Sequence, residues 1–400
     1  MTEVGVDVET INTEALGDRG YLVHDGEAAL VVDPQRDFDR VEALAVRLGV
    51  RITHVAETHV HNDYVTGGLA LARRHDAEYL VAAAEDVAFA RHPVRPGDEF
   101  AVGAMTVTAV ATPGHTEHHL AYLVEHDGRR AVFSGGNLLF GSVGRTDLVA
   151  PGMTTDLTRA QYRSARALAD RAGDHATLHP THGFGSFCSS GPAVVADAST
   201  IAEQRRSNHV LTDDDEQHFV RTLIENLTEH PSYYSHMAPL NRSGPGAPDL
   251  AVPEPLRADE VAARIGRGEW VVDLRDRVAF AAGHLSGTVG FEHGPSFTTY
   301  LGWLLPRDER VTLVGSEDAV REAIRDLCRI GVDGPDAAIG DPADGLVPGH
   351  PVVAYPRATW SDLVARSTPA DRADPPVVVD VRRADEHRVG HVTGSTPIPL

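Results

Sequence analysis

Three side chains that can bind a metal ion lie close together in the motif His59-x-His61-x-Asp63. Histidines two residues apart on a strand end or an extended loop can both turn toward one point. Neutral imidazoles suit a borderline metal ion such as zinc or iron, and zinc–nitrogen bonds are about 2.0–2.1 Å long. Asp63 adds a carboxylate that can serve as a hard ligand or as a general base. The spacing therefore favours a metal site, although a chain with 22 histidines also contains such pairs by chance.

The elements on either side of this motif are those that would hold it at the end of a strand. The apolar run Ile52–Ala56 predicts a short buried strand that stops just before the histidines. Gly67 and Gly68 follow, and they let the backbone turn tightly into a helix predicted over 65–75. This strand–loop–helix arrangement makes a chance pair of histidines the weaker interpretation.

Two more predicted strands end in loops that carry a histidine. A β-rich run over 107–111 leads to Thr-Pro-Gly-His115-Thr, and a strand over 176–178 leads to Pro-Thr-His182-Gly. Hairpins over 21–32 and 120–133 and helices over 38–48, 156–171, 192–207 and 213–228 complete the predicted pattern. Strands that alternate with helices and end at polar loops predict an α/β sandwich whose site lies at the strand ends.

These three motifs, in this order, resemble those of the metallo-β-lactamase fold, and most nearly those of its persulfide dioxygenases and their glyoxalase II relatives. The resemblance implies an αββα sandwich in which His59, His61 and His115 bind the metal. It also implies that Asp63 and His182 act as a base, as orienting groups or as weak ligands. Three further histidines are expected beside the site or in solvent rather than on the metal: His118, His119 (as an orienting residue) and His179.

Two positions depart from the family pattern. Tyr64 stands where the first motif normally ends in His, and Gly136 stands where the family has the Asp of Phe-(Ser/Thr)-Gly-Asp. In the family that carboxylate bridges two metals or completes an iron site. We therefore expect one metal per chain, iron as Fe²⁺ by resemblance, with zinc as the alternative. Gly136→Asp is expected to tighten iron binding if the loop accepts a Cβ.

The segment Leu139–Leu148 resembles the Gly-Arg-Thr-Asp element of the same family. Arg145 and Asp147 are expected to form an ion pair that braces the site. Alternatively, Arg145 holds a carboxylate of a glutathione-like substrate in a bidentate manner. With Asp63 and His182, Arg145 completes the set of residues to which we assign a catalytic role.

Beyond a Pro- and Gly-rich linker the chain repeats a short pattern. Val271–Arg275 and Val378–Arg382 each end in Asp-x-Arg, and a Gly-His pair follows in each, with His284 and His391 eleven residues after the Asp. A strand and turn of this kind resemble the opening of a rhodanese domain. Two copies at one offset are hard to explain otherwise.

Within these 400 residues, neither copy contains the thiol that sulfur transfer needs, and whether the chain continues past Leu400 to such a thiol is open. The strand predicted over 311–314 runs into an acidic loop without Cys, and Cys328 falls on the apolar face of the following helix. The second copy stops at Leu400, before its active-site loop. Cys188 is predicted to be a structural thiol, because no basic side chain adjacent to it in the sequence would lower its pKa.

The predicted fold class is α/β, with a metallo-β-lactamase αββα sandwich followed by α/β rhodanese-like domains. The predicted division is a metal-binding domain over 1–242, a linker over 243–255, a rhodanese-like domain without its Cys over 256–345, and part of a second over 357–400.

Composition limits the partners. A formal net charge of −22 argues against nucleic acid and anionic membranes, and a chain without lysine cannot form Schiff bases. Two cysteines, an acidic N-terminus without an apolar segment and the lack of any apolar run near ~18 residues predict a cytoplasmic protein. Whether it forms a homo-oligomer is left open.

The resemblance and the domain fusion point to sulfane-sulfur metabolism. The first interpretation is a persulfide dioxygenase that oxidises glutathione persulfide, a small thiol conjugate, with O₂ at a mononuclear metal site. The second is a zinc hydrolase of a thioester such as S-lactoylglutathione, with Asp63 as the base. The third is a non-catalytic protein that binds sulfane sulfur.

Overall fold

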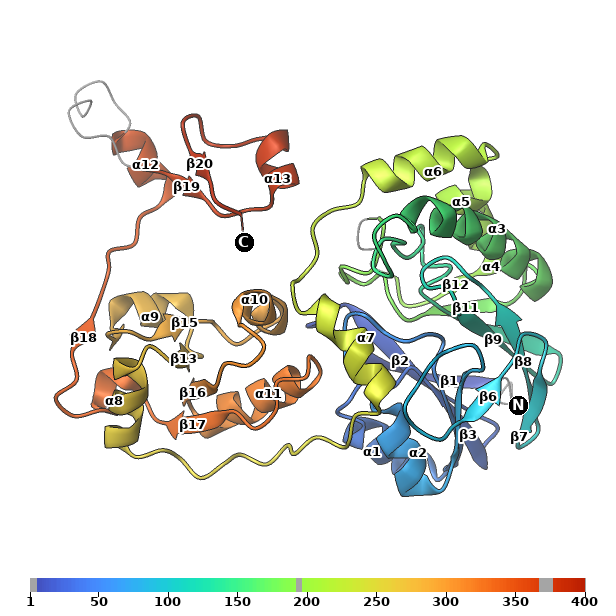
Figure 1. The fold of residues 1–400 in the computed structure, drawn as a ribbon, viewed down its shortest axis with the longest axis horizontal. Helices are drawn as coiled ribbons and strands as arrows, with labels where there is room; N and C mark the ends of the chain where they lie inside the picture. The colour runs from blue at the N-terminus through green and yellow to red at the C-terminus, as the bar shows by residue number, and fades with distance from the viewer. Residues whose placement is uncertain (1–5, 192–195, 367–376, 400) are drawn as a thin grey trace, which may run out of the picture. The chain divides into compact units, whose positions relative to one another are not determined.

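The structure is a computed structural model that describes residues 6–191, 196–366 and 377–399. The chain divides into two compact units (Figure 1). The N-terminal unit comprises residues 1–249 with 325–333, and the C-terminal unit comprises 250–324 with 334–400.

The N-terminal unit contains two six-stranded sheets. The first sheet has its strands in sequence order: β1 (Asp7–Thr13), β2 (Asp18–His24), β3 (Ala28–Val32), β4 (Arg51–Ala56), β5 (Glu78–Ala82) and β6 (His92–Val94). The second sheet runs in reverse order: β12 (Ser199–Thr200), β11 (Thr177–Pro180), β10 (Arg129–Gly135), β9 (Leu120–His126), β8 (Met105–Ala111) and β7 (Glu99–Val102). Strands β3 to β6 are parallel, and so is the pair β10 and β11.

Helices cover the outer face of each sheet. On the first sheet, α1 (Asp39–Leu48) and α2 (Gly68–His75) bury an apolar stripe that includes Val41, Leu44 and Leu69. The helices α3 (Thr154–Ala172), α4 (Ile201–Ser207), α5 (His209–Thr212) and α6 (Glu216–Glu225) pack on the second. A further helix, α7 (Tyr234–Ser243), completes the unit.

The core between the two sheets explains why they face each other. Leu30 and Leu80 of the first sheet cluster with Val107, Tyr122 and Phe133 of the second, and all are buried. Burying one apolar face of each sheet against the other is the main stabilising term of such a sandwich. The N-terminal unit therefore has the predicted αββα architecture.

Most predicted elements of this unit are confirmed, because alternating or helical apolar patterns specified them. The hairpins appear as β2–β3 and β9–β10, and the strand before the histidines appears as β4. The helix predicted from residue 192 is wrong at its start, since β12 precedes α4, and residues 192–195 lie outside the described part. Thr200 begins α4 through a capping box with Glu203, a pattern that marks a helix N-terminus.

The C-terminal unit is built on a four-stranded parallel sheet. Its strand order is β15 (Val289–Gly290), β13 (Trp270–Asp273), β16 (Val311–Gly315) and β17 (Asp336–Ile339). The helices are α8 (Ala258–Gly266), α9 (Arg277–Ala282), α10 (Phe297–Leu304), α11 (Glu317–Cys328, which belongs to this unit up to Ile324), α12 (Trp360–Arg366), α13 (Ala384–Val389) and a 3-10 turn, η1 (Pro342–Asp344). Two small pairings, β14 (His284–Leu285) with β18 (Val352–Val353) and β19 (Val379–Asp380) with β20 (Thr396–Pro397), complete it.

The two copies of the Asp-x-Arg pattern adopt the same local geometry. Arg275 pairs with Asp273 and donates from Nη2 to the Gly283 carbonyl at 2.8 Å. In the second copy, Arg382 pairs with its Asp and donates to the Gly390 carbonyl at the same 2.8 Å.

The histidines of the two copies also match. His284 Nδ1 donates to the Phe280 carbonyl at 2.8 Å, and His391 Nδ1 donates to the His387 carbonyl at 2.9 Å. Each ring stacks on that same neighbour at a centroid distance of 3.9 Å. The sequence repeat is therefore also a repeat of structure.

None of the helices in the described ranges is both long and apolar enough to cross a membrane.

Candidate metal centre

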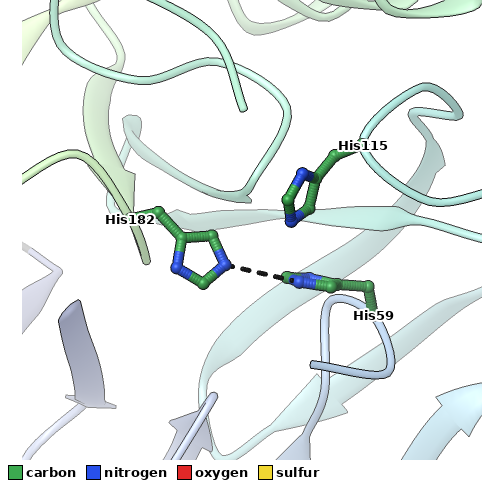
Figure 2. Close-up of side chains that lie close together, drawn as sticks. All are labelled: His59, His115 and His182. Carbon is green, nitrogen blue, oxygen red and sulfur yellow. Dashed lines mark hydrogen bonds between the residues drawn. The ribbon is translucent and has the colours of Figure 1, made fainter. Parts of the chain in front are cut away.

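Three loops at strand ends bring imidazoles together in the N-terminal unit. His59 follows β4, His115 follows β8 and His182 follows β11. Their rings face one another (Figure 2), with centroids 4.7 Å apart for His59 and His115 and 5.3 Å for each pair that includes His182. All three are buried, so the fold holds a histidine cluster away from bulk water.

Hydrogen bonds fix which nitrogen of each ring faces the cluster. His59 Nδ1 donates to Thr58 Oγ1 at 2.9 Å, because the Thr58 hydroxyl gives its own proton to Asp33. His115 Nδ1 donates to the Arg145 carbonyl at 2.7 Å. Both rings therefore present an Nε2 lone pair to the centre, an assignment that rests on the hydrogen-bond network.

His182 completes this set from the opposite side. Its Nδ1 donates to Asp18 Oδ1 at 2.8 Å and lies 3.1 Å from Asp63 Oδ2. Its Nε2 lies 3.4 Å from His59 Nε2. Ligand atoms of His59, His115 and His182 all lie within 4.8 Å of one another, so the structure groups His182 with two of the histidines expected to bind metal.

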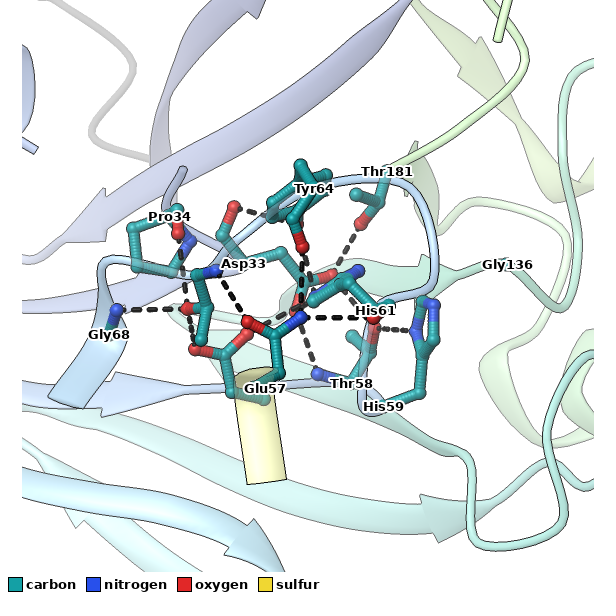
Figure 3. A network of polar contacts seen from close by, with 12 residues as sticks. Asp33, Pro34, Glu57, Thr58, His59, His61, Tyr64, Gly68, Gly136 and Thr181 are labelled. Carbon is teal, nitrogen blue, oxygen red and sulfur yellow. Dashed lines mark hydrogen bonds and ion pairs between the residues drawn. The ribbon is translucent and has the colours of Figure 1, made fainter. Parts of the chain in front are cut away.

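His61 stands between the cluster and a buried pair of carboxylates (Figure 3). Its Nε2 contacts Glu57 Oε2 at 3.1 Å and Asp33 Oδ1 at 3.2 Å. Its Nδ1 is buried and has no hydrogen-bond partner among the described residues. Together with Asp63 and His182, it forms a second set of potential ligands within 4.8 Å.

Buried atoms without partners mark the place where a cation fits. In the described part of the chain they include His61 Nδ1, His115 Nε2, Asp63 Oδ1 and Asp18 Oδ2. Buried polar groups in folded proteins are almost always paired, so a group of unpaired acceptors around one point needs a proton or a metal ion. Imidazole nitrogens and carboxylate oxygens are the ligands of both iron and zinc.

The pKa values of the metal-free cluster agree with a binding site for a cation. Burial lowers the pKa of His61, but Asp33 and Glu57 outweigh it and raise the pKa to about 9. Burial also opposes charge on His182, yet Asp63 and Asp18 hold its pKa well above the usual value. Burial, with His182 nearby, lowers the pKa of His115 to about 3. Protons on two histidines thus supply the positive charge that a metal ion would bring.

The pocket around His115 has no room for a side chain at position 136. A Cβ on Gly136 would lie 2.2 Å from His115 Cδ2, and one on Gly144 would lie 2.7 Å from His115 Nδ1. Gln161 accepts from the His115 N–H at 2.7 Å and donates to the Gly136 carbonyl at 3.1 Å. The condition for the Gly136→Asp expectation, that the loop accepts a Cβ, is therefore not met by this backbone, because the His115 ring occupies the space.

His119 lies beside the cluster but does not accept the second ring N–H of His59 or His115, because those protons go to Thr58 and to the Arg145 carbonyl. The Gly136 N–H donates to His119 Nε2 at 3.0 Å, and His119 Nδ1 contacts Thr112 Oγ1 at 2.8 Å. Its ring stacks on His59 at 4.9 Å, which fixes the tilt of that imidazole. His118 is exposed, and half-buried His179 stacks on Phe133.

Tyr64 does not take over the role of the missing histidine. Its ring stacks on His61 at 4.3 Å, and its hydroxyl lies 3.0 Å from His61 Nε2 and donates to the Asp33 carbonyl at 3.3 Å. Burial raises the pKa of this phenol well above its usual value. Tyr64 is thus a neutral group on the carboxylate side of His61.

Arg145 forms the predicted ion pair with Asp147. Nε to Oδ1 is 2.7 Å and Nη2 to Oδ2 is 2.8 Å. Arg145 also donates to the carbonyls of Phe187 and Thr228, at 3.0 and 2.7 Å. The guanidinium is almost fully buried, and these contacts favour a bracing role over contact with a substrate carboxylate.

Several residues of the site were not found from the sequence. Asp33 accepts hydrogen bonds from Thr58 and Thr181, so it ties together the ends of β3, β4 and β11. Asn241 of α7 donates to the carbonyls of His61 and Tyr64, at 2.9 and 2.8 Å. In the sequence, Asp33 merely follows the hairpin predicted over 21–32. The backbone φ of Asp33 is 52°, a left-handed value that is rare for a residue other than Gly and that no local sequence pattern predicts.

Comparison with known proteins identifies the class of this region. Residues 20–182 match the family model of the metallo-beta-lactamase superfamily. A metallo-beta-lactamase from Staphylococcus aureus superposes with a TM-score of 0.74 and 24% identity, over 84% of this chain and 99% of that one. ETHE1 from Myxococcus xanthus superposes with a TM-score of 0.51 and 28% identity, over 59% of this chain and 98% of that one. The N-terminal unit therefore has the metallo-beta-lactamase αββα fold, with a buried His/Asp cluster in the region that matches the superfamily model.

Sequence relatives cover less of the chain. A hydroxyacylglutathione hydrolase from Rhizobium johnstonii is 38% identical over 107 residues, which is 26% of this chain and 41% of that protein. One from Neisseria meningitidis is 35% identical over 125 residues, 31% of this chain and 49% of that protein. The matched segments thus span less than half of each relative.

Proposed function

We propose that the N-terminal unit is a mononuclear non-haem iron oxygenase that oxidises a thiol persulfide, such as glutathione persulfide, with O₂. The observation that carries this proposal is two overlapping sets of potential ligands, one of His59, His115 and His182 and one of His61, Asp63 and His182. The second set has two histidines and one carboxylate. Two histidines and one carboxylate are the ligand set typical of non-haem iron oxygenases, which leave positions open for substrate and O₂.

The packing of the site supports one metal ion rather than two. Gly136 has no side chain, and the His115 ring fills the space in which a bridging carboxylate would lie. Tyr64 supplies no imidazole and points its hydroxyl toward Asp33. A second ion would therefore lack two of the ligands that the family resemblance leads one to expect.

The proposed reaction balances with water as co-substrate: RSSH + O₂ + H₂O gives RSH + SO₃²⁻ + 2 H⁺. The sulfur–sulfur bond breaks, the outer sulfur loses four electrons, and O₂ gains four. Bound Fe²⁺ would supply the coupling between O₂ reduction and sulfur oxidation.

The residues of the chain would hold the reacting groups and move protons. The tautomers of His59 and His115 are fixed by Thr58 and by the Arg145 carbonyl, so both rings keep an Nε2 lone pair toward the centre. Asp18 contacts His182, and burial together with Asp63 raises the pKa of Asp18 to about 7. That pair supplies buried titratable groups that can carry the protons released with sulfite.

The sequence relatives support a second candidate, a zinc-dependent hydrolase of a glutathione thioester. Bound zinc would lower the pKa of a water, and Asp63, with its unpaired Oδ1, would accept the proton. The support is the name shared by the two relatives at 35–38% identity, which match parts of the chain only.

Metal content and two substrates separate these candidates. Full-length protein purified without added metal should contain iron, consume O₂ with glutathione persulfide and leave S-lactoylglutathione intact. Asp63→Asn should abolish O₂ consumption, whereas His175→Ala, a change at an exposed histidine outside the cluster, should not. Zinc-loaded protein that cleaves the thioester while iron-loaded protein ignores the persulfide would establish the hydrolase. Protein without metal and without either activity would favour simple sulfane-sulfur binding.

We also propose that the C-terminal unit is rhodanese-like, with the domain boundaries predicted from the sequence, and that its first copy, over 256–345, does not transfer sulfur. The matching Asp–Arg and His contacts of its two copies support one repeated module. Burial raises the pKa of Cys328 to about 12, so this thiol is not a nucleophile at neutral pH.

A further inference from the structure

A cavity of about 740 Å³ lies beside the loops that carry the proposed ligands. Val60, between His59 and His61, forms part of its wall, as does Thr116, which follows His115. Asn62 lies in the same wall, one residue before Asp63. A molecule in this cavity would therefore lie next to the proposed metal centre, and the volume is that of a small-molecule site.

The walls of the cavity carry an excess of acidic groups. Four acids line it (Glu85, Asp86, Glu117 and Asp147), together with a single arginine, Arg242. Arg145 neutralises Asp147, and Arg242 lies 3.3 Å from Glu85. Asp86 and Glu117 are exposed and form no ion pair within the described residues.

A further feature of the wall points to a ligand. The buried hydroxyl of Thr116 has no hydrogen-bond partner in the described ranges, although it can both donate and accept.

We propose that this cavity binds the non-reacting part of a thiol substrate that carries an ammonium group and no carboxylate. The inference rests on the proposed function, and it departs from glutathione as the carrier thiol. Glutathione has two carboxylates, and the only arginine in the cavity wall is already paired. An amine-bearing thiol instead places its positive charge beside the exposed carboxylates of Asp86 and Glu117.

Binding of unreactive thioethers to the full chain tests the proposal without any turnover. S-methylcysteamine carries the ammonium group, N-acetyl-S-methylcysteamine is its neutral match, and S-methylglutathione carries the carboxylates. We expect calorimetry to show S-methylcysteamine binding about 3- to 10-fold more tightly than its acetylated match, from two exposed charge contacts. S-methylglutathione should bind most weakly of the three.

Charge variants show whether the acids cause this order. The double variant Asp86→Asn/Glu117→Gln should remove the preference for the amine and improve binding of S-methylglutathione. The control Asp7→Asn/Glu27→Gln changes the net charge equally at exposed positions outside the cavity wall and should preserve the order. Equal or tighter binding of S-methylglutathione by the native chain, or no effect of the double variant, would overturn the inference.

Turnover separates this inference from the proposed reaction. Iron-loaded protein should consume O₂ faster with cysteamine persulfide than with glutathione persulfide. If neither persulfide is oxidised while the binding preference persists, the oxygenase proposal fails and the assignment of the cavity stands. If glutathione persulfide is the better substrate and S-methylglutathione the better ligand, the oxygenase proposal stands and the cavity assignment fails.

Discussion

The two units both place histidines and carboxylates at the ends of strands, but they treat those groups in opposite ways. In the C-terminal unit, Asp273 receives the backbone N–H and the guanidinium of Arg275, and His284 gives its Nδ1 proton to the Phe280 carbonyl. In the N-terminal unit, His115 Nε2 and His61 Nδ1 are buried and have no partner in the described part of the chain.

This difference distinguishes a structural motif from a ligand site. A strand end whose polar atoms are all hydrogen-bonded has no lone pair left for a ligand, even when it contains histidines. A buried set of unpaired acceptors is unfavourable unless a cation completes it. The unpaired atoms, more than the number of histidines, therefore locate the site.

The largest expected effect is loss of metal from the N-terminal unit when one imidazole is removed. His59→Ala and His115→Ala should each lower metal affinity by more than the roughly 10- to 100-fold typical of losing a group that only supports a ligand. His118→Ala should retain the metal, because His118 is exposed and outside the cluster. Elemental analysis of the three purified variants measures this, and retained metal in His115→Ala would show that the cluster is not the site.

The second-largest effect on metal binding is expected when a side chain is added at position 136. Gly136→Ala and Gly136→Asp both add a Cβ that would meet the His115 ring at 2.2 Å, so both should displace that imidazole and weaken metal binding. Gly246→Ala is the control, since a Cβ there meets nothing within 4 Å. Tighter iron binding by Gly136→Asp, measured by competition with a chelator, would contradict the packing argument.

The protons in the cluster predict how stability depends on pH. The pKa of His61 is about 9 in the folded metal-free protein and about 6.5 when unfolded. Its stabilising contribution is therefore complete below pH 6.5 and is lost as the pH rises through 9. Thermal unfolding of metal-free protein should shift to lower temperature between pH 7 and 9. Metal-loaded protein should resist that shift, because the ion replaces the proton. Parallel pH curves for the two forms would argue against a shared site.

A smaller effect is expected in the C-terminal unit, on stability alone. Asp273 is fully buried beside Arg275, so Asp273→Asn should destabilise this unit by about 3–5 kcal/mol, as removing one partner of a buried pair does. Asp380→Asn breaks the same contact in the second copy, where Arg382 is half exposed, and should change stability little. Neither should alter metal content. Chemical denaturation of both variants measures how much free energy of unfolding each one loses. Equal losses would contradict the prediction that the loss depends on burial of the Asp–Arg contact.

The smallest effect, no change at all, is expected for sulfur-transfer activity when Cys328 is replaced. The 400-residue chain should not move sulfur from thiosulfate to cyanide, and Cys328→Ser should leave that baseline unchanged, because the thiol is buried with a pKa of about 12. Sulfur transfer that disappears in Cys328→Ser would show that the first rhodanese-like copy is a working enzyme.

The sequence predicted the parts of the N-terminal unit that local patterns specify. Apolar runs located β4 and α1, and turn residues located the β9–β10 hairpin, because these elements depend on nearby residues. The loops carrying His59, His115 and His182 were found for the same reason, since each follows a strand.

The rest depends on distant segments meeting in space. Asp18 and His182 are 164 positions apart, and Asn241 contacts His61 across 180 positions, so no local pattern reports either contact. The role of Gly136 also depends on packing that its sequence position does not reveal. Its sequence position suggested a missing carboxylate, but the three-dimensional packing shows a glycine that makes room for His115.

Anomalous diffraction from crystals of the full chain grown with iron tests the central claim most directly. We predict a single iron peak per chain, bounded by the imidazoles of His59, His61, His115 and His182 with the Asp63 carboxylate. Two peaks per chain, or one peak on the far side of His61 between Asp33 and Glu57, would contradict it.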